Sequence, residues 1–181
     1  MMHYFLIASL PVLEIGDPAP FTVAEFDDLL RENLAEKEQK KIFAYTGGKN
    51  YPTCGGIYKA MALFEEYLRT AIARKRAERA GKQFSAPDPE EYYSEVDFGL
   101  TQAASCSNPL EREYIIDRLR WAHLEELALG HDFDLDALCI YRIQLFIVNK
   151  YAAFRTETGT VNFSAALEQV INSPGRTIKE S

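Results

Sequence analysis

Asp134-Leu135-Asp136-Ala137-Leu138-Cys139-Ile140-Tyr141-Arg142-Ile143-Gln144-Leu145-Phe146-Ile147-Val148 is the stretch that decides the fold. Its apolar side chains cover more than one face of a helix, which predicts a central helix, capped by Asp134 and running to about Phe154. Arg142 and Gln144 interrupt the apolar run, and no run in the chain reaches the roughly 18 apolar residues of a membrane span. We therefore expect a core helix and no direct membrane insertion.

The helix before this stretch has clear end signals. Asn108 is a preferred N-cap, Pro109 suits the first helical position, and Gly130 ends the helix. The residues expected on its buried face are Ile115, Ile116, Leu119, Ala122, His123 and Leu127. Because the loop 130–133 is short, the two helices are predicted to form a long antiparallel pair.

A third long helix follows the glycine-rich loop 46–56. Its apolar residues recur at intervals of four and three, as in the seam of a packed helix. They are Ile57, Met61, Phe64, Leu68 and Ala71. Lys75 and Arg79 continue the same stripe, so we expect this helix to outrun its packing partner, project toward water and end at Gly81.

The N-terminal region predicts shorter elements. Residues 4–10 are aromatic and branched, which favours a short strand over one helical turn, and we expect Phe5, Ile7 or Leu10 to be buried. An N-terminus this apolar would otherwise fray.

Thr22, with Glu25 three residues later, forms a capping-box pattern that predicts a helix to about Asn33. A second short helix is expected over 36–45.

The remaining segments have weaker patterns. A linker spans 82–89, an acidic helix is expected to start at Asp88 or Pro89, and 99–107 is predicted to be irregular or a short helix. A last helix, capped near Asn162, is predicted over Ala165 to Ile171. The fold class is therefore mainly α: a single helical domain over 1–172 with a long antiparallel helix pair, a short extended N-terminal segment and a polar tail over 173–181.

Composition narrows the class of protein further. The 181 residues carry a net charge of −7, which argues against nucleic acid as the main partner. The three cysteines are far apart and form no C-x-x-C motif, which indicates a reducing compartment. The opening stretch lacks the basic region of a signal peptide, so we expect a cytoplasmic protein.

Several possible sites are better explained as structure. The aspartates of 131–136 resemble a calcium loop, but Ala137 and Ile143 stand where that loop needs Gly and Glu, so a negatively charged helix N-terminus is favoured. The loop around Lys49 departs from the phosphate-binding Gly-Lys-Ser/Thr pattern. Cys54 has no identifiable partner base, and His123 suits a core position. We therefore predict no catalytic residue, no metal site and no cofactor.

The end of the long helix carries a basic cluster, with Arg74, Lys75, Arg76 and Arg79 as its candidate partner-binding residues. One interpretation is a docking patch for an acidic surface. The other is a solvated face that pairs with the acidic run 88–97, and charge runs are usually of this second kind.

Arg142, among apolar neighbours, supports an alternative function. A buried guanidinium needs an acidic partner or an anionic ligand. An internal ion pair is favoured. The alternative is a free-standing helical enzyme or small-molecule-binding protein, with a pocket near Arg142 and loop 46–56.

The start of the chain resembles a known group. Tyr4-Phe5-Leu6-Ile7-Ala8-Ser9-Leu10-Pro11, followed by Phe26-Asp27-Asp28-Leu29-Leu30-Arg31-Glu32-Asn33-Leu34, resembles a bacterial family of uncharacterised proteins encoded among V-type ATPase subunits. Tyr45-Thr46-Gly47-Gly48 is also similar to a turn of the d-type (C-type) subunit of those ATPases. The resemblance covers about the first fifty residues.

This resemblance implies a non-enzymatic subunit or accessory factor of a V-type ATPase. The d-type protein links the membrane rotor ring to the central stalk and has no catalytic residues of its own. The partners implied are V-type ATPase subunits, and the location implied is cytoplasmic or peripheral on the membrane through that complex.

Overall fold

The computed structural model describes residues 3–52, 55–87, 89 and 91–152. Over this part of the chain every regular element is a helix, which confirms the mainly α prediction. The seven helices are α1 (Tyr4–Ala8), α2 (Val23–Asn33), α3 (Glu36–Phe43), α4 (Gly56–Arg79), α5 (Ser94–Ser105), α6 (Pro109–Ala128) and α7 (Leu135–Ala152).

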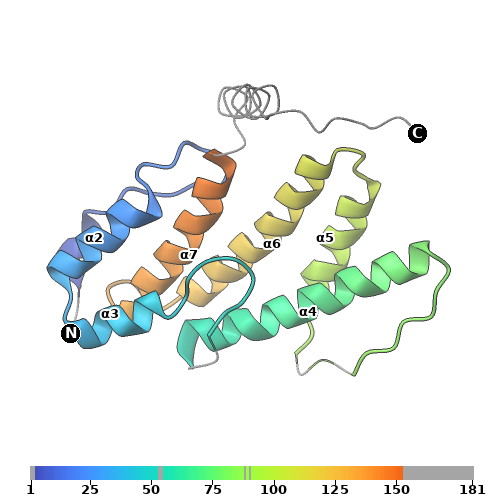
Figure 1. Ribbon diagram of the computed structural model, residues 1–181, viewed down its shortest axis with the longest axis horizontal. Coiled ribbons are helices and arrows are strands. Elements are labelled where there is room, and N and C mark those ends of the chain that lie inside the picture. The colour runs from blue at the N-terminus through green and yellow to red at the C-terminus, as the bar shows by residue number, and fades with distance from the viewer. Residues whose placement is uncertain (1–2, 53–54, 88, 90, 153–181) are drawn as a thin grey trace, which may run out of the picture.

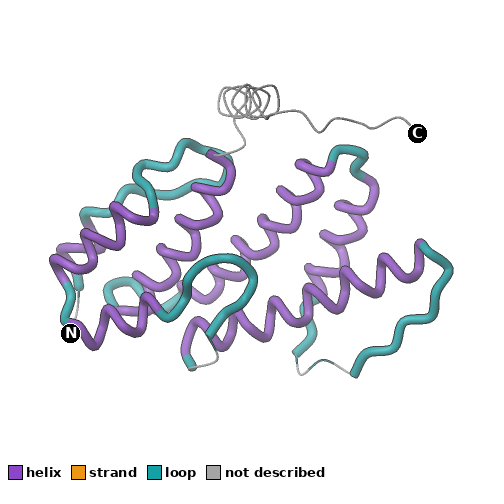
Figure 2. The backbone as a smooth tube through the Cα atoms, viewed as in Figure 1, coloured by secondary structure: helices purple, strands orange, loops and turns teal. Residues whose placement is uncertain are grey.

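The helices form one assembly around α7. Figure 1 shows α2, α7, α6 and α5 side by side, with α3 and α4 running across their lower end, and the helix contacts follow this order. The predicted antiparallel pair is α6 and α7, joined by a short turn. Figure 2 shows the longer loops, which follow α1, α3 and α4.

The core forms where α7 meets its neighbours. Leu138, Ile143 and Leu145 are fully buried, as expected of a helix that is apolar on most sides. The predicted seam of α4 is also confirmed, because all five of its residues are buried. On α6 the prediction is partly wrong: Ala122 is exposed, and Trp121 is buried instead.

Local sequence signals predict the starts of α2, α6 and α7 correctly. The Thr22 side chain accepts a hydrogen bond from the Glu25 backbone, and Glu25 bonds back to the Thr22 backbone. The Asn108 side chain accepts from the Leu110 N–H at 2.9 Å. Asp134 accepts from the Ala137 N–H at 3.0 Å. Each cap satisfies a backbone donor that a helix N-terminus leaves without a partner.

The N-terminal strand prediction is wrong. Residues Tyr4–Ala8 form α1, because no strand lies beside them within the described residues and a helix satisfies their backbone groups internally. The His3 N–H donates to the Phe133 carbonyl at 2.8 Å and attaches α1 to the turn between α6 and α7. Phe5 is 88 % exposed, while Ile7 and Leu10 are half-buried against the core.

Two predictions about the middle of the chain also need correction. Helix α5 begins at Ser94 and not at residues 88–89, and it continues to Ser105 through the segment predicted to be irregular or a short helix. Helix α4 ends at Arg79, with Gly81 (φ +62°) directly after its cap as predicted, but its last turns pack beside α5, so it does not project alone into water. The predicted last helix and the polar tail lie outside the described residues. Among the helices described, none has the length and hydropathy needed to cross a membrane.

Candidate functional site

The basic end of α4 forms one wall of a groove between α4, α5 and α6. The cavity measures about 160 Å³, and its lining residues are Ile72, Lys75, Arg76, Arg79, Leu100, Ala103, Ala104, Arg112 and Ile116. Every charged residue in this lining is a cation. We call it the basic groove. The floor is apolar and the rim is positive.

Two arginines of the groove hold the C-terminal end of α5. Arg79 donates to the Ala104 carbonyl. Arg112 donates from Nε to the Ala103 carbonyl at 3.3 Å and from Nη2 to the Cys106 carbonyl at 2.8 Å. The last carbonyls of a helix lack helical partners and carry partial negative charge, which favours cations there. Arg79 and Arg112 therefore fix the shape of the groove.

Lys75 and Arg76 have no carboxylate partner within the part of the chain that the structure describes. Arg74 likewise has no ion pair there, and it lies on the exposed side of α4, next to the groove and outside its lining. These three positive charges are thus open to an external acidic group.

The pairing of the basic cluster with the acidic run is not observed for the described members of that run. The Asp97 carboxylate instead accepts from the hydroxyls of Tyr67, at 3.2 Å, and Tyr92, at 3.1 Å. Burial, together with the Asp97 charge, raises the pKa of Tyr67 to about 12. The Glu91 carboxylate accepts from the Tyr93 hydroxyl. Tyrosines, and not the basic cluster, therefore take up these two carboxylates.

Arg142 forms the favoured internal ion pair. Its Nε and Nη2 donate to the two Asp27 oxygens at 2.7 and 2.9 Å, and Nη1 donates to the Tyr45 carbonyl. Its guanidinium also lies 5.0 Å from the Phe146 ring centroid. The pair ties α7 to α2 and to the start of loop 46–56, so Arg142 has no free face for a ligand.

Loop 46–56 borders a separate cavity of about 260 Å³. Gly47, with φ +99°, lies against Phe146, where a Cβ would come within 2.8 Å of the ring. The Tyr45 hydroxyl donates to the Gly48 carbonyl at 2.8 Å, and the Tyr45 ring stacks on Tyr51 at 4.7 Å. Arg142 does not line this cavity. The small-molecule hypothesis therefore loses the residue that motivated it.

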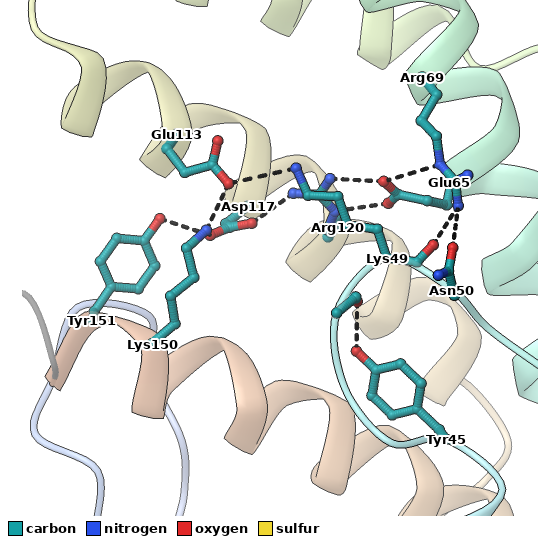
Figure 3. A network of polar contacts seen from close by, with 11 residues as sticks. Tyr45, Lys49, Asn50, Glu65, Arg69, Glu113, Asp117, Arg120, Lys150 and Tyr151 are labelled. Carbon is teal, nitrogen blue, oxygen red and sulfur yellow. Dashed lines mark hydrogen bonds and ion pairs between the residues drawn. The ribbon is translucent and has the colours of Figure 1, made fainter.

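A charge network with three buried members, Glu65, Asp117 and Arg120, crosses the core beside that cavity (Figure 3). Glu65 of α4 accepts two hydrogen bonds from Arg120 of α6, at 2.8 and 2.9 Å. Arg120 also donates to Asp117 at 2.6 Å, and Asp117 accepts from Lys150 and Tyr151 of α7 at 2.6 and 2.8 Å. We call these five residues the central charge network.

The central charge network is neutralised from within. Burial alone would lower the pKa of the Arg120 guanidinium, but the hydrogen bonds and charges of Glu65 and Asp117 outweigh it and raise that pKa. Sequence reasoning missed this network. Asp117 and Arg120 are three residues apart on one helix, a spacing that predicts contact, but nothing in the sequence relates Glu65 to Arg120.

His131, Asp134 and Asp136 are the one group of potential metal ligands that the described residues bring together. Their atoms are already engaged: His131 Nδ1 lies 2.6 Å from Asp134, and Lys41 donates to Asp136 at 2.6 Å. Asp134 also caps α7. The arrangement fits the predicted negatively charged helix N-terminus, and the Asp134 bond raises the pKa of His131.

His123 occupies a core position. It is 8 % exposed and stacks on Phe64 with 4.4 Å between ring centroids. Neither ring nitrogen has a hydrogen-bond partner in the described structure, and Glu126 lies 3.6 Å from Nδ1. Burial lowers the pKa of His123 against the opposing effect of Glu126. Cys54 lies outside the described residues.

The structure places three of the four predicted partner-binding residues, Lys75, Arg76 and Arg79, in the basic groove, and it adds Arg112, which sequence reasoning missed. Comparison of the chain with models of protein families, with curated proteins and with solved structures finds no match.

Proposed function

We propose that the protein is a non-enzymatic subunit or accessory factor of a bacterial V-type ATPase, acting by protein–protein contact, and that the basic groove is its contact surface. The observation that carries the docking role is the charge of Lys75 and Arg76, unpaired within the described residues, above an apolar floor that includes Ile72, Leu100 and Ile116. An apolar centre with a charged rim is the composition typical of a protein interface.

The groove favours an acidic partner for an electrostatic reason. Its lining holds four cations and no carboxylate, so an acidic side chain at the rim gains attraction without displacing an existing ion pair. Charged contacts of this kind affect how fast the partner binds and which partner is chosen. They affect the affinity of the complex less. The assignment of a V-type ATPase as the partner rests on the resemblance of the first fifty residues.

Co-purification tests the proposal. The tagged full-length chain, isolated from its own host at low salt, should recover the A, B or D subunits of the ATPase. Recovery should fall as the salt concentration rises, because the rim charges are exposed and screened. A preparation that keeps the ATPase intact but yields none of its subunits with the tagged chain would refute the proposed function.

Charge reversal tests the groove itself. Lys75→Glu with Arg76→Glu should strongly reduce the recovery of the partner. The matched control is Lys37→Glu with Lys59→Glu, which makes the same change in net charge at exposed positions outside the groove. An equal loss in both variants would show that net charge, and not the groove, controls binding.

A further inference from the structure

The cavity beside loop 46–56 is separate from the basic groove and has a volume of about 260 Å³. We call it the loop cavity. Its lining residues are Tyr45, Gly48, Lys49, Tyr51, Asp117, Arg120, Phe146, Ile147 and Lys150, and none of them lines the basic groove. The loop cavity is therefore a second surface, which the proposed function leaves unused.

Two contacts hold the loop in place beside this cavity. Gly47 packs against α7, where a Cβ would come within 2.8 Å of the Phe146 ring. From α4, Arg69 donates to the Lys49 carbonyl (Figure 3). The loop is thus fixed by its own chain, as in most small-molecule sites, which are largely formed before the ligand binds.

One part of the lining is aromatic. The rings of Tyr45 and Tyr51 stack with 4.7 Å between their centroids, and Phe146 meets Tyr45 edge-on at 5.3 Å. Such surfaces favour an aromatic or apolar ligand. An apolar cavity of about 150 Å³ is large enough to bind benzene, so the loop cavity has room for a ring with a short side chain.

Charged side chains form another part of the lining. Lys49, Arg120 and Lys150 are cations, and Asp117 is the carboxylate among them. Both Arg120, at 4 % exposed, and Asp117, at 3 % exposed, are buried. Asp117 already accepts hydrogen bonds from Arg120, Lys150 and Tyr151, so its negative charge is compensated before a ligand binds.

The ion pairs around the loop cavity contain one more cation than carboxylates. They join Lys49, Arg69, Arg120 and Lys150 to Glu65, Glu113 and Asp117. Lys49 is the most loosely paired cation of the lining, because its Nζ lies 3.8 Å from the Glu113 oxygen that Lys150 holds at 2.7 Å (Figure 3). Among the described residues, no carboxylate lies within hydrogen-bond distance of Lys49 Nζ. Lys49 therefore retains donors for the carboxylate of a ligand.

We propose that the loop cavity binds a small organic monocarboxylate with an aromatic body. The carboxylate accepts hydrogen bonds from Lys49 and from the third N–H of Lys150, whose other two bond to carboxylates of the protein. The ring lies against Tyr51 and Phe146. A single surplus positive charge matches a monocarboxylate better than a phosphate ester, which carries about −1.5 to −2 at neutral pH. The proposal does not depend on the proposed function, since it concerns a different surface.

Backbone NMR of the full-length protein tests the proposal, with hydrocinnamate as the probe and the neutral hydrocinnamamide as its matched control. Hydrocinnamate should shift the backbone N–H signals of Gly48, Lys49 and Tyr51. Hydrocinnamamide should bind at least about tenfold more weakly, because it lacks the negative charge that pairs with Lys49. Equal affinity for the two probes would overturn the proposal, as would the absence of shifts at these three residues.

Substitution of Lys49 tests the source of the charge. Lys49→Gln should weaken hydrocinnamate binding by about tenfold, because a charge-assisted hydrogen bond is lost, and Lys49→Arg should keep most of the affinity. The Lys49 side chain is 53 % exposed, so both variants should fold. The matched control Lys59→Gln removes an exposed lysine outside the cavity and should leave the affinity unchanged. Equal weakening by Lys49→Gln and Lys59→Gln would overturn the proposal.

Lys75→Gln with Arg76→Gln separates the loop cavity from the basic groove. This double variant should bind hydrocinnamate with the wild-type affinity, although the basic groove has lost two cations. Loss of hydrocinnamate binding in the double variant would place the probe in the basic groove and overturn the proposal for the loop cavity. A failure of the ATPase co-purification, in contrast, would refute only the proposed function.

Discussion

The central charge network and the rim of the basic groove both contain lysine and arginine, but in the described part of the chain the cations of the network are paired and those of the rim are not. In the network, Arg120 is 4 % exposed and bonded to Glu65 and Asp117. At the rim, Lys75 and Arg76 have no carboxylate partner in the described structure, and Arg76 is exposed. Both sets lie on or against α4, within a few turns of each other.

The difference shows that a cation's surroundings, and not its position in the sequence pattern, decide its role. A buried charge must be paired, because removing it from water costs several kcal/mol. Once paired, it has no attraction left for a partner. An exposed unpaired cation contributes little to folding but keeps its attraction for an acidic surface. Substitutions in the two regions should therefore separate folding from docking.

The largest effect is expected for Arg120→Met. It removes both hydrogen bonds that Arg120 donates to the buried Glu65 carboxylate and leaves only Arg69, 3.8 Å away, beside it, so we expect a loss of about 3–5 kcal/mol in the free energy of unfolding. Urea unfolding measures it. Glu65→Leu combined with Arg120→Met removes both charges and should recover most of that loss. A single variant within about 0.5 kcal/mol of wild type would contradict a structural role for the network.

Arg112→Met is expected to lower the free energy of unfolding by less than Arg120→Met does. Arg112 lines the basic groove and also supports the fold, so it combines the docking and folding roles. Its hydrogen bonds to the Ala103 and Cys106 carbonyls stabilise the end of α5. Their removal should cost about 1–2 kcal/mol in urea unfolding. Arg118→Met, an exposed position on the same helix, serves as control and should stay within about 0.5 kcal/mol. If Arg112→Met and Arg118→Met lost equal free energy of unfolding, the Arg112 hydrogen bonds would not be what stabilises the end of α5.

His123 tests a third case, a buried ionisable group without a hydrogen-bond partner in the described structure. Its pKa is lowered from the ordinary 6.5, so below that pH the unfolded chain binds more protons than the native protein does. Stability should therefore fall as the pH drops from about 7 to 5. His123→Phe keeps the stacking on Phe64 and should reduce this slope. Parallel stability curves for the two proteins between pH 7 and 5 would contradict the expectation.

The smallest effect on folding is expected for Lys75→Glu with Arg76→Glu. Neither side chain has an ion pair to lose among the described residues, so the free energy of unfolding should change by less than about 0.5 kcal/mol. The same variant should lose partner binding. If urea unfolding instead showed a loss as large as that of Arg120→Met, the rim would be part of the folding core and not a docking surface.

Most of the fold could be predicted because its signals are short-range. The caps at Thr22, Asn108 and Asp134 involve residues two or three positions apart, and each is confirmed. The seam of α4 repeats over several turns. The strand predicted for residues 4–10 is wrong because a strand requires a neighbour, which a short apolar run does not reveal.

Only the part of the basic groove that lies on α4 could be predicted from the sequence. Lys75, Arg76 and Arg79 are close in the sequence, so their cluster is visible there. Arg112 joins them only because α5 and α6 fold back beside α4. The pairing of Asp97 with Tyr67 and Tyr92, which leaves the basic cluster unneutralised by that carboxylate, likewise depends on tertiary placement.

The position of α7 between α2 and α6 has a consequence for the synthesis of the protein. Helices α2 and α3 pack on α7, which lies about a hundred residues later in the chain. Translation proceeds at roughly 5–20 residues per second, so α7 is synthesised about 5–20 s after α2 and α3. Over that interval the N-terminal helices lack the surface of α7 that covers them in the folded protein, where Phe26, Leu30 and Ile42 are buried.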